Sequence, residues 1–398
     1  MDCYLDNAAT TRVLPGAVHE MEMIFREDYG NPSSLHRKGF EAERIISDAK
    51  EKFAGILKCQ PREILFTSGG TESNNLAILG TARRFARGNR HMITTAIEHP
   101  SVSEPMKFLE DNGWRIDRIR VNSEGIVDLE ELLEKLQEDT ALVSVMHVNN
   151  EIGAVEPLRR ISEIIREKAP DCLFHVDDIQ GFCKIAIQPR KLGIDFLSAS
   201  SHKVCGPKGV GLLYVSERAK PKPILFGGGQ QGGLRSGTEN VPGIGGFAHA
   251  ATEIHSHWEE NLPRLSLLRE DFIRKIMEIG GVTINGPKGK GLDGNLSRAD
   301  LDEIELSPYI VSLSVEGVRS EVLLHALEDK DISVSAGSAC SSNKPHVSET
   351  LKAIGGPEYA LSSTIRLSFS AFTTEEELSY AAEALKILIP QLRRFTRK

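Results

Sequence analysis

The sequence predicts an α/β protein with a mostly parallel sheet covered by helices, and two observations carry this prediction. From about residue 60 to 225, short apolar runs alternate with longer amphipathic stretches, which is the pattern of strands connected by helices. At 398 residues, the chain is also long enough to form one sizeable domain and a smaller one.

Strands are expected at six short apolar runs, namely residues 64–67, 91–95, 141–147, 173–177, 196–200 and 211–215. Between them, three stretches carry apolar side chains at spacings of three and four, which predicts helices over residues 72–86, 129–137 and 161–168. Beyond the glycine-rich loop 227–233, a helix-rich segment near 243–279 gives way to a shorter mixture of strands and helices. This change predicts a second, smaller domain, with a surface loop at residues 288–305.

The composition is that of an ordinary globular protein. Apolar residues make up 40% of the chain, charged residues make up 26%, and the net charge is −8. These values predict neither a disordered chain nor a broad basic surface for nucleic acid. The first seven residues are acidic where a secretory signal would be basic, and no apolar run is long enough to span a bilayer. We therefore expect a cytoplasmic protein that binds neither DNA nor a membrane.

The cysteines are scattered thinly along the chain, at Cys3, Cys59, Cys172, Cys183, Cys205 and Cys340. They form no CxxC pair and no Cys/His cluster at zinc spacing, so we expect neither a disulfide framework nor a metal site. Most of them are expected to be small buried hydrophobic residues. Cys340 differs because it lies in a run of Ser, Ala and Gly that can bend freely and offers little to pack.

Lys203 follows the expected strand 196–200 and is enclosed by the turn residues of Gly206-Pro207-Lys208-Gly209. Ligands of α/β sheets usually bind at strand ends, and a lysine amine there can form an imine with a carbonyl cofactor. Most lysines are solvated surface residues, so this placement alone favours the surface role.

Two further features lie at strand ends. Asp177 ends the expected strand 173–177, where its carboxylate could keep the ring nitrogen of pyridoxal phosphate protonated, although alone it is as readily a helix cap. Ser68-Gly69-Gly70-Thr71 joins another expected strand to a helix, and this arrangement presents backbone N–H groups and the positive end of the helix dipole to an anion. The loop lacks the spacing of a Walker loop or a GxGxxG fingerprint, and such turns are common.

Together, these residues resemble the cysteine desulfurases of the NifS/IscS type, which are class-V aminotransferase family members that use pyridoxal phosphate. The matching stretches run in the family's order across nearly the whole chain. They are residues 4–11, 30–34, 66–75, 98–102, 147–153, 175–177, 200–203, 206–209, 235–240, 335–342 and 365–368.

The resemblance implies the aspartate aminotransferase-like fold, the fold type I of pyridoxal phosphate enzymes. A large domain, residues 14–260, would hold the cofactor on a mostly parallel seven-stranded sheet. Residues 1–13 and 261–398 would form a smaller α+β domain that carries the Cys340 loop.

The resemblance also implies roles at the cofactor ring. Lys203 would hold pyridoxal 5'-phosphate as a Schiff base and move the substrate's protons, while Asp177 would pair with the ring nitrogen. Gln180 and Asn150 would hydrogen-bond the phenolic oxygen. His99 would stack on the ring and serve in acid/base steps.

Further roles concern the phosphate, the substrate and a second chain. The phosphate would be held by Gly70, Thr71, Ser200 and His202. Thr238 would reach the phosphate of the neighbouring subunit, which implies a homodimer with shared sites. Arg366, with help from Asn31, would grip the carboxylate of L-cysteine.

Cys340 would take the substrate's sulfur as a persulfide and leave alanine, because a thiolate on a flexible loop can attack that sulfur and then reach an acceptor. The acceptor would be an iron–sulfur scaffold protein or a tRNA-thiolation enzyme. Two alternatives are a selenocysteine lyase with the same lysine and a non-catalytic paralogue that only docks sulfur carriers.

Asp178 is a departure from the pattern, since alanine is usual there. Adjacent strand residues point to opposite faces, so only one of Asp177 and Asp178 can meet the ring nitrogen, and the spacing to Gln180 favours Asp177.

Overall fold

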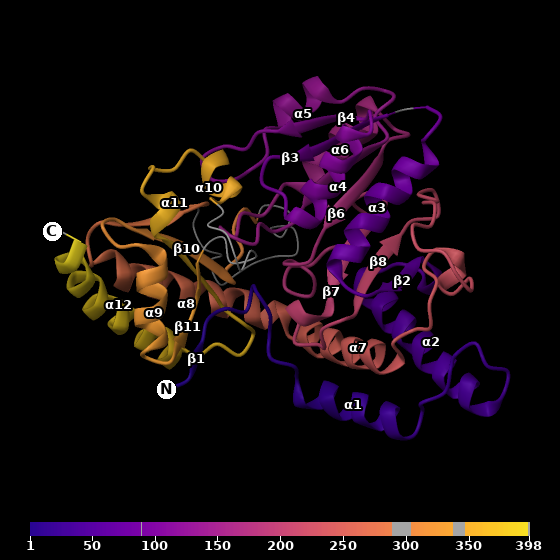
Figure 1. The fold of residues 1–398 in the computed structure, drawn as a ribbon, viewed down its shortest axis with the longest axis horizontal. Coiled ribbons are helices and arrows are strands. Elements are labelled where there is room, and N and C mark those ends of the chain that lie inside the picture. Colours follow the sequence, from indigo (N-terminus) through magenta and orange to yellow (C-terminus); the bar gives the residue numbers. More distant parts are fainter. Residues whose placement is uncertain (89, 289–303, 337–346, 397–398) are drawn as a thin grey trace.

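A seven-stranded sheet forms the larger part of the computed structural model, which describes residues 1–88, 90–288, 304–336 and 347–396 (Figure 1). The strand order is β2-β8-β7-β6-β5-β3-β4, and only β8 runs antiparallel to its neighbours. The strands are β2 (Ile64–Thr67), β3 (His91–Thr95), β4 (Arg115–Ile119), β5 (Leu142–Met146), β6 (Leu173–Asp177), β7 (Phe196–Ser200) and β8 (Gly211–Val215). The mostly parallel seven-stranded sheet is therefore confirmed.

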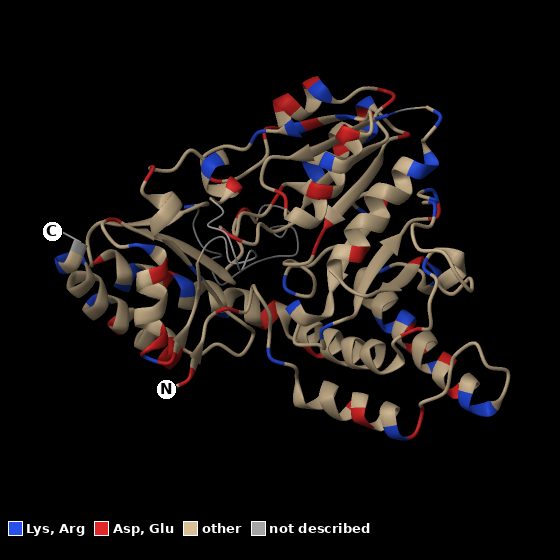
Figure 2. Ribbon diagram, viewed as in Figure 1, with Lys and Arg blue, Asp and Glu red and all other residues tan. Residues whose placement is uncertain are grey.

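Helices cover both faces of this sheet. They are α1 (Pro15–Arg26), α2 (Arg37–Leu57), α3 (Gly70–Arg84), α4 (Pro100–Asp111), α5 (Leu129–Lys135), α6 (Leu158–Lys168) and α7 (Val241–Ser256). Side chains of α2, α5, α6 and α7 share one apolar core with the sheet, whereas α3 and α4 pack into a second core. Lys, Arg, Asp and Glu lie along these helices (Figure 2), and exposed ion pairs such as Arg160–Glu163 join some of them.

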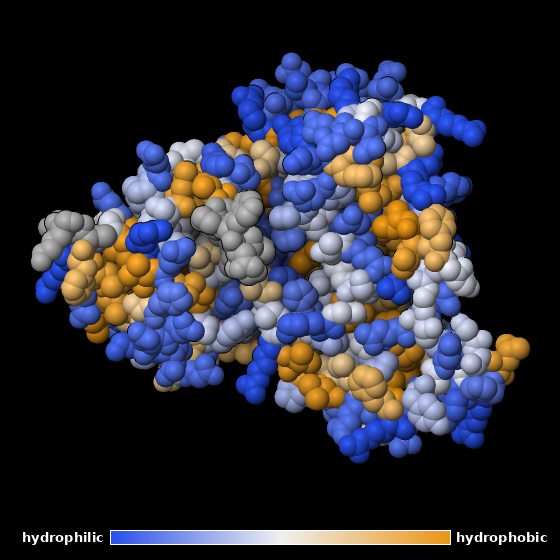
Figure 3. Space-filling model, viewed as in Figure 1, coloured by the Kyte–Doolittle hydropathy of each residue, from blue (hydrophilic) through white to orange (hydrophobic). Residues whose placement is uncertain are grey.

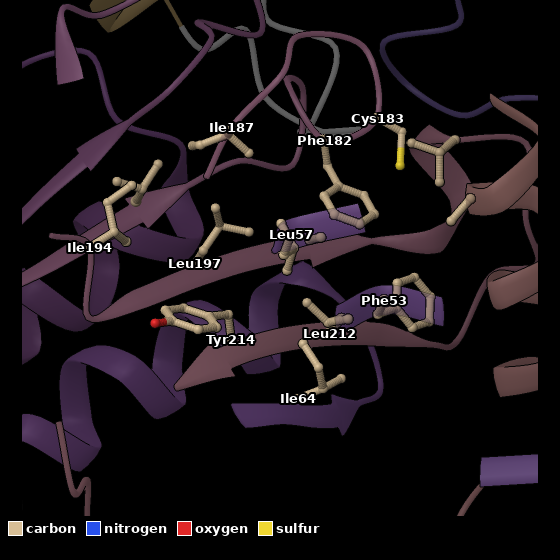
Figure 4. Close-up of a cluster of buried hydrophobic side chains, with 14 of the residues drawn as sticks. Phe53, Leu57, Ile64, Phe182, Cys183, Ile187, Ile194, Leu197, Leu212 and Tyr214 are labelled. Carbon is tan, nitrogen blue, oxygen red and sulfur yellow. The ribbon is translucent and has the colours of Figure 1, made fainter. Parts of the chain in front are cut away.

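Alternation along the strands divides their side chains between the two cores. On β6, Phe174 and Val176 enter the core under α2, α6 and α7, while Leu173 enters the core under α3 and α4. Figure 4 shows the first core, where the ring of Phe53 lies 4.6 Å from that of Phe247 and 5.8 Å from that of Phe66. Because the strands are buried on both faces, polar side chains gather where the strands end.

A four-stranded antiparallel sheet, in the order β12-β13-β10-β9, forms the centre of the smaller part. Its strands are β9 (Val282–Asn285), β10 (Ile310–Val315), β12 (Ser335–Ala336) and β13 (Thr364–Ser368). A separate pair joins β1 (Cys3–Tyr4) to β11 (Ile332–Ser333) in parallel. The helices here are α8 (Trp258–Met277), α9 (Ser320–Glu328), α10 (Glu349–Ala353), α11 (Ala360–Ser363) and α12 (Glu375–Thr396). The domain boundary at residues 260 and 261 stays a prediction.

The N-terminal segment belongs to the core of this smaller part. Cys3, Leu5 and Ala8 are buried with the side chains of β10, β13, α8 and α12, and the N-terminus lies beside those elements (Figure 1). Asp6 also bridges to Ser368 at the end of β13. The segment that follows, residues 9–14, therefore links the two parts.

Each of the six expected strands occurs, and five have the predicted bounds, while β5 is one residue shorter at each end than the predicted 141–147. The helix expected over 72–86 starts at Gly70, two residues earlier, and the one expected over 161–168 starts at Leu158. The helix-rich segment 243–279 contains α7 and α8. Most of the expected loop 288–305 lies outside the described residues. No helix among the residues described is long and apolar enough to cross a membrane.

Glu156 is a buried carboxyl group whose ionisation should destabilise the fold. Its Oε2 accepts a hydrogen bond of 2.9 Å from the Val127 N–H, but its Oε1 has no hydrogen-bond partner within residues 1–88, 90–288, 304–336 and 347–396. Burial raises the pKa of Glu156 from 4.5 to about 8, although the Val127 N–H opposes this. Between pH 4.5 and 8, the folded chain therefore keeps a proton on Glu156 that the unfolded chain releases. Because the unfolded state binds fewer protons, the free energy of unfolding falls as the pH rises through this range.

We expect Glu156→Gln to raise the free energy of unfolding at pH 8 by about 2–4 kcal/mol and to change it little at pH 5, since the amide keeps the Val127 contact without a charge. Denaturant unfolding at the two pH values measures this difference. Glu163→Gln, in the exposed pair with Arg160, is the control and should change neither value appreciably. An equal effect of Glu156→Gln at both pH values would contradict the assignment.

Candidate functional site

A pocket of about 380 Å³ lies at the carboxyl ends of β5, β6 and β7, where the N-terminus of α3, the N-terminal segment and β13 meet. Its lining residues are Ala8, Ala9, Gly70, Thr71, His99, Ser101, Met146, Val148, Asn150, Asp177, Ile179, Gln180, Ser200, His202, Lys203 and Arg366. A larger groove of about 880 Å³ runs beside Tyr4, Arg12 and Phe372, but no lysine lines it. The smaller pocket thus brings together ten of the thirteen residues expected at the site.

Lys203 enters the pocket from the 3-10 turn Ser201–Lys203, which directly follows β7. Its Nζ donates hydrogen bonds of 2.6 Å to the carbonyl oxygen of Ala8 and 2.8 Å to that of Ala9. The N-terminal segment therefore holds the amine inside the pocket and away from the solvated surface.

Asp177 lies at the carboxyl end of β6, where it is only 4% exposed. Its Oδ2 accepts a hydrogen bond of 2.7 Å from Asn74 Nδ2, and its Oδ1 accepts one of 3.1 Å from the Ile179 N–H. Burial raises the pKa of Asp177, while His99, these two donors and Lys203 favour the carboxylate. The group is therefore a fixed acceptor in a low-dielectric setting.

His99 caps the N-terminus of α4. Its Nδ1 accepts the Ser101 N–H at 3.1 Å and lies 2.8 Å from the Ser101 hydroxyl. Burial lowers the pKa of His99, against the opposing effect of Asp177 and with a further lowering by Lys203. A neutral imidazole at the pocket can take up a proton.

One end of the pocket is suited to an anion. Gly70 begins α3, so the free N–H groups of the first helical turn face this end, together with Thr71, Ser200 and His202. A Cβ on Gly70 would overlap with the Ile179 side chain, which explains the glycine. Burial, aided by nearby lysines, lowers the pKa of His202 to about 4, so it is neutral and can donate without adding charge.

Arg366 supplies the cation at the opposite side, from β13. Its Nη1 donates a hydrogen bond of 2.7 Å to the Asn150 carbonyl, and its Nη2 lies 3.1 Å from Asp6 Oδ1. Its Nε is buried and has no hydrogen-bond partner in the part of the chain that the structure describes. The guanidinium is 5% exposed and can bind an anion inside the pocket.

Three expected residues are not in this pocket. Asn31 and Thr238 are exposed and do not line it, and Asn31 Oδ1 instead accepts the Ser33 N–H at 2.9 Å. Cys340 lies outside the described residues. The roles of these three therefore stay predictions.

The comparisons with known proteins identify the family of this chain. The family model described as Aminotransferase class-V matches residues 3–380. This chain belongs to the class-V aminotransferase family. Members of the family depend on pyridoxal 5'-phosphate, and this is also the cofactor of this chain.

The relatives of this class-V enzyme include two named cysteine desulfurases. Cysteine desulfurase IscS of Dictyoglomus turgidum is 39% identical over 98% of this chain and 95% of its own length. Cysteine desulfurase IscS 1 of Archaeoglobus fulgidus is 39% identical over 98% of this chain and 97% of its own length. A solved NifS-like protein superposes with a TM-score of 0.89 at 37% identity, covering 98% of this chain and all of the other.

The class-V pocket of this chain fits the cofactor. The helix N-terminus can take the phosphate, and Asp177 offers a carboxylate to a ring nitrogen. Gln180 donates from Nε2 to the Ala8 carbonyl at 2.9 Å, while no described residue hydrogen-bonds its buried Oε1, so one end of the amide can serve a bound group. Within the described chain, no group of three or more His, Cys, Asp or Glu side chains is arranged for a metal ion.

Three contributors to the site had no role in our sequence-based expectations. They are Asn74, which bonds Asp177; Ser101, which bonds His99; and Asp6, which pairs with Arg366. Asn74 lies three and four residues after Thr71 and Gly70 and so faces the same side of α3, a spacing that could have identified it. Asp6 contacts Arg366 across 360 residues of chain, and no local pattern identifies that pairing.

Proposed function

We propose that the protein is a cysteine desulfurase, which removes sulfur from L-cysteine to give L-alanine and a persulfide on Cys340. The observation that carries this proposal is the presence of Lys203, Asp177 and Arg366 in one pocket. Their groups suit a carbonyl cofactor, a ring nitrogen and an amino-acid carboxylate. The names of the two relatives support the choice of cysteine as substrate.

The cofactor would be held along the pocket by residues from several strand ends. The phosphate would contact Gly70, Thr71, Ser200 and His202. Asp177 would pair with the ring nitrogen, Gln180 and Asn150 would hydrogen-bond the phenolic oxygen, and His99 would stack on the face of the ring. When bound, pyridoxal phosphate withdraws electrons from the substrate carbon next to the carboxylate. The protein supplies the orientation and the proton transfers.

Arg366 would bind the substrate carboxylate and so place the amino group of cysteine near Lys203. The Lys203 amine, between the Ala8 and Ala9 carbonyls, would carry protons to and from the substrate. Burial lowers the pKa of His99, and its imidazole would serve in acid/base steps. Asn31 would assist Arg366, although it does not line the pocket of its own chain.

Cys340 would receive the sulfur. Its thiolate would attack the sulfur of the bound cysteine, so that the carbon–sulfur bond breaks and its electron pair stays with the carbon. A proton from the site would complete alanine, and the sulfur would remain on Cys340 as a persulfide. No external oxidant or reductant takes part in this step.

We expect the wild type to convert cysteine to alanine and sulfide in the presence of a thiol reductant, and Cys340→Ala to release less than roughly 1% as much sulfide. The variant should still show an absorbance change when cysteine is added, since the pocket is intact. Cys59→Ala removes a half-buried thiol elsewhere and should keep full activity.

Normal sulfide release by Cys340→Ala would place the nucleophile elsewhere. Selenocysteine should be assayed beside cysteine, because turnover of selenocysteine with negligible turnover of cysteine would identify a selenocysteine lyase instead. Binding of a sulfur-carrier protein without turnover of either amino acid would identify a docking paralogue.

We further propose a homodimer in which Thr238 reaches the phosphate site of the other subunit. Thr238 is exposed, and large apolar side chains are exposed on α1 (Phe25), on the loop between α1 and α2 (Tyr29 and Leu35) and at the start of α2 (Phe40). Figure 3 shows apolar surface over α1 and α7 and at the tip of the α1–α2 loop. Exposed apolar patches of this kind commonly mark interfaces.

Sedimentation should give twice the chain mass of 43.8 kDa. Phe25→Asp combined with Phe40→Asp should shift the protein towards the monomer, while Phe395→Asp, an equally exposed apolar side chain on α12, should not. A monomeric wild type would refute the shared-site proposal.

The persulfide sulfur would pass to an iron–sulfur scaffold protein or to a tRNA-thiolation enzyme. The named relatives support sulfur transfer to an acceptor, and pull-down with Cys340-persulfide protein would identify it.

We also propose a cytoplasmic location, because the five cysteines that the structure describes are all free thiols. Cell fractionation tests this location.

A further inference from the structure

A buried histidine–aspartate pair lies directly behind the cofactor aspartate. His147 Nδ1 is 2.6 Å from Asp178 Oδ1, and the side chains are 5% and 0% exposed. Neither residue lines the pocket. Asp178 is also the position at which this sequence departs from the alanine usual in the pattern it resembles.

The pair extends the contact between two strands beyond their last paired residues. In the sheet, β5 and β6 pair as far as Met146 and Asp177, and the His147 N–H then donates 2.8 Å to the Asp177 carbonyl. The Asp178 N–H donates 3.0 Å to the Ser198 carbonyl on β7. The side-chain bond therefore joins β5 and β6 where both leave the sheet, on the face opposite to the Asp177 carboxylate.

The turn that carries Gln180 packs against the same pair. The Asp178 carbonyl accepts hydrogen bonds of 3.1 Å from the Gly181 N–H and 2.7 Å from the Phe182 N–H. A Cβ on Gly181 would overlap with both Asp178 Oδ1 and His147 Nδ1. Glycine at this position thus allows the pair to close against the backbone of the turn.

Polar and ionisable groups surround the buried carboxyl group of Asp178. Burial raises the pKa of Asp178, while His147 and Lys184 favour its carboxylate and Asp177 opposes it. Lys184 is itself buried. An unpaired carboxylate would be costly in this interior, so loss of the His147 contact should disturb the local structure.

We propose that the His147–Asp178 pair positions the cofactor-binding residues by closing the ends of β5 and β6 and fixing the turn from which Asp177 and Gln180 face the pocket. Both members act through these neighbours and are positioning residues. Asn150, three residues beyond His147, depends on the same closure. The inference rests on the proposed cofactor site, although it requires no turnover of cysteine.

The test is the dissociation constant of pyridoxal phosphate, measured by titrating the apoenzyme well below its melting temperature. Asp178→Ala should weaken binding about tenfold or more, and Asp178→Asn should stay within about threefold of the wild type, because the amide oxygen can still accept from His147 Nδ1. Gly181→Ala keeps both side chains but forces them apart, and it should reproduce the loss.

The control removes a pair of the same chemistry at the other end of the sheet. His91 Nε2 lies 3.0 Å from Asp117 Oδ2, and His91 begins β3, far from the carboxyl ends. Asp117→Ala should lower the melting temperature without changing cofactor affinity. The double variant Asp178→Ala, His147→Leu should bind pyridoxal phosphate no more weakly than whichever of its two single variants binds it less tightly, because both substitutions remove the same contact.

Unchanged affinity in both Asp178→Ala and Gly181→Ala would overturn the proposal, as would additive losses in the double variant. If Asp178→Ala does not fold, wild-type affinity in Gly181→Ala overturns it alone. A wild type that binds no pyridoxal phosphate would instead refute the proposed function. Wild-type binding without cysteine turnover would leave the positioning test intact.

Discussion

Replacing Lys203 with alanine should reduce turnover of cysteine by roughly 10,000-fold or more, because the residue is proposed both to attach the cofactor and to move substrate protons. Its Nζ is already held in the pocket by the Ala8 and Ala9 carbonyls. We also expect the wild type to be yellow and this colour to be lost in Lys203→Ala. After borohydride reduction, mass spectrometry should find the pyridoxyl group on the peptide containing Lys203 only in the wild type.

Lys203→Arg is the matched variant, since a guanidinium keeps the charge and can donate to the same two carbonyls but does not form an imine. It should be as inactive as Lys203→Ala while remaining as stable as the wild type. Borohydride labelling of Lys184 or Lys208 in the wild type would assign the cofactor to another lysine.

Asp177→Asn should lower kcat/KM by roughly 1,000-fold while leaving the cofactor attached to Lys203. The change is nearly isosteric, yet it removes the negative charge beside the ring nitrogen. It also turns an N–H donor towards either the Ile179 N–H or Asn74 Nδ2, both of which donate to Asp177. Steady-state kinetics and borohydride labelling on the same preparation separate the two effects.

Asn74→Ala provides the comparison for Asp177→Asn. It removes one of the donors to the carboxylate but keeps the charge, so its loss of kcat/KM should be about tenfold. If Asp177→Asn were no worse than Asn74→Ala, the charge of Asp177 would not be needed and its proposed pairing with the ring nitrogen would be wrong.

Much of the fold could be predicted because the buried parallel strands are continuous apolar runs. Strand β4 was missed, since Arg115, Asp117 and Arg118 interrupt its apolar residues at the sheet edge and only Ile116 and Ile119 are buried. Alternating polar residues are typical of an edge strand, and they give a weaker signal than a central strand does.

Some residues of the candidate site could likewise be predicted from the sequence, and others could not. Lys203, Asp177 and the Gly70–Thr71 turn follow directly from strand ends, because parallel strands bring their carboxyl ends to one edge. Contacts made between distant segments could not be predicted, such as the pairing of His147 with Asp178 and of Asp6 with Arg366. The sequence alone shows Asp178 only as a departure from the family's usual alanine, because its partner His147 lies on a different strand end.

The pairing of Asp6 with Arg366 means that the cation proposed to bind the substrate already has a carboxylate partner within the chain. An amino acid bound by Arg366 would have to share Nη2 with Asp6 or displace it, while Nε has no hydrogen-bond partner among the described residues. We therefore expect Asp6 to compete with any anion that approaches Arg366, and small inorganic anions to bind there weakly. A substrate that also bonds to the cofactor has an additional attachment and can outcompete Asp6 where a simple anion does not.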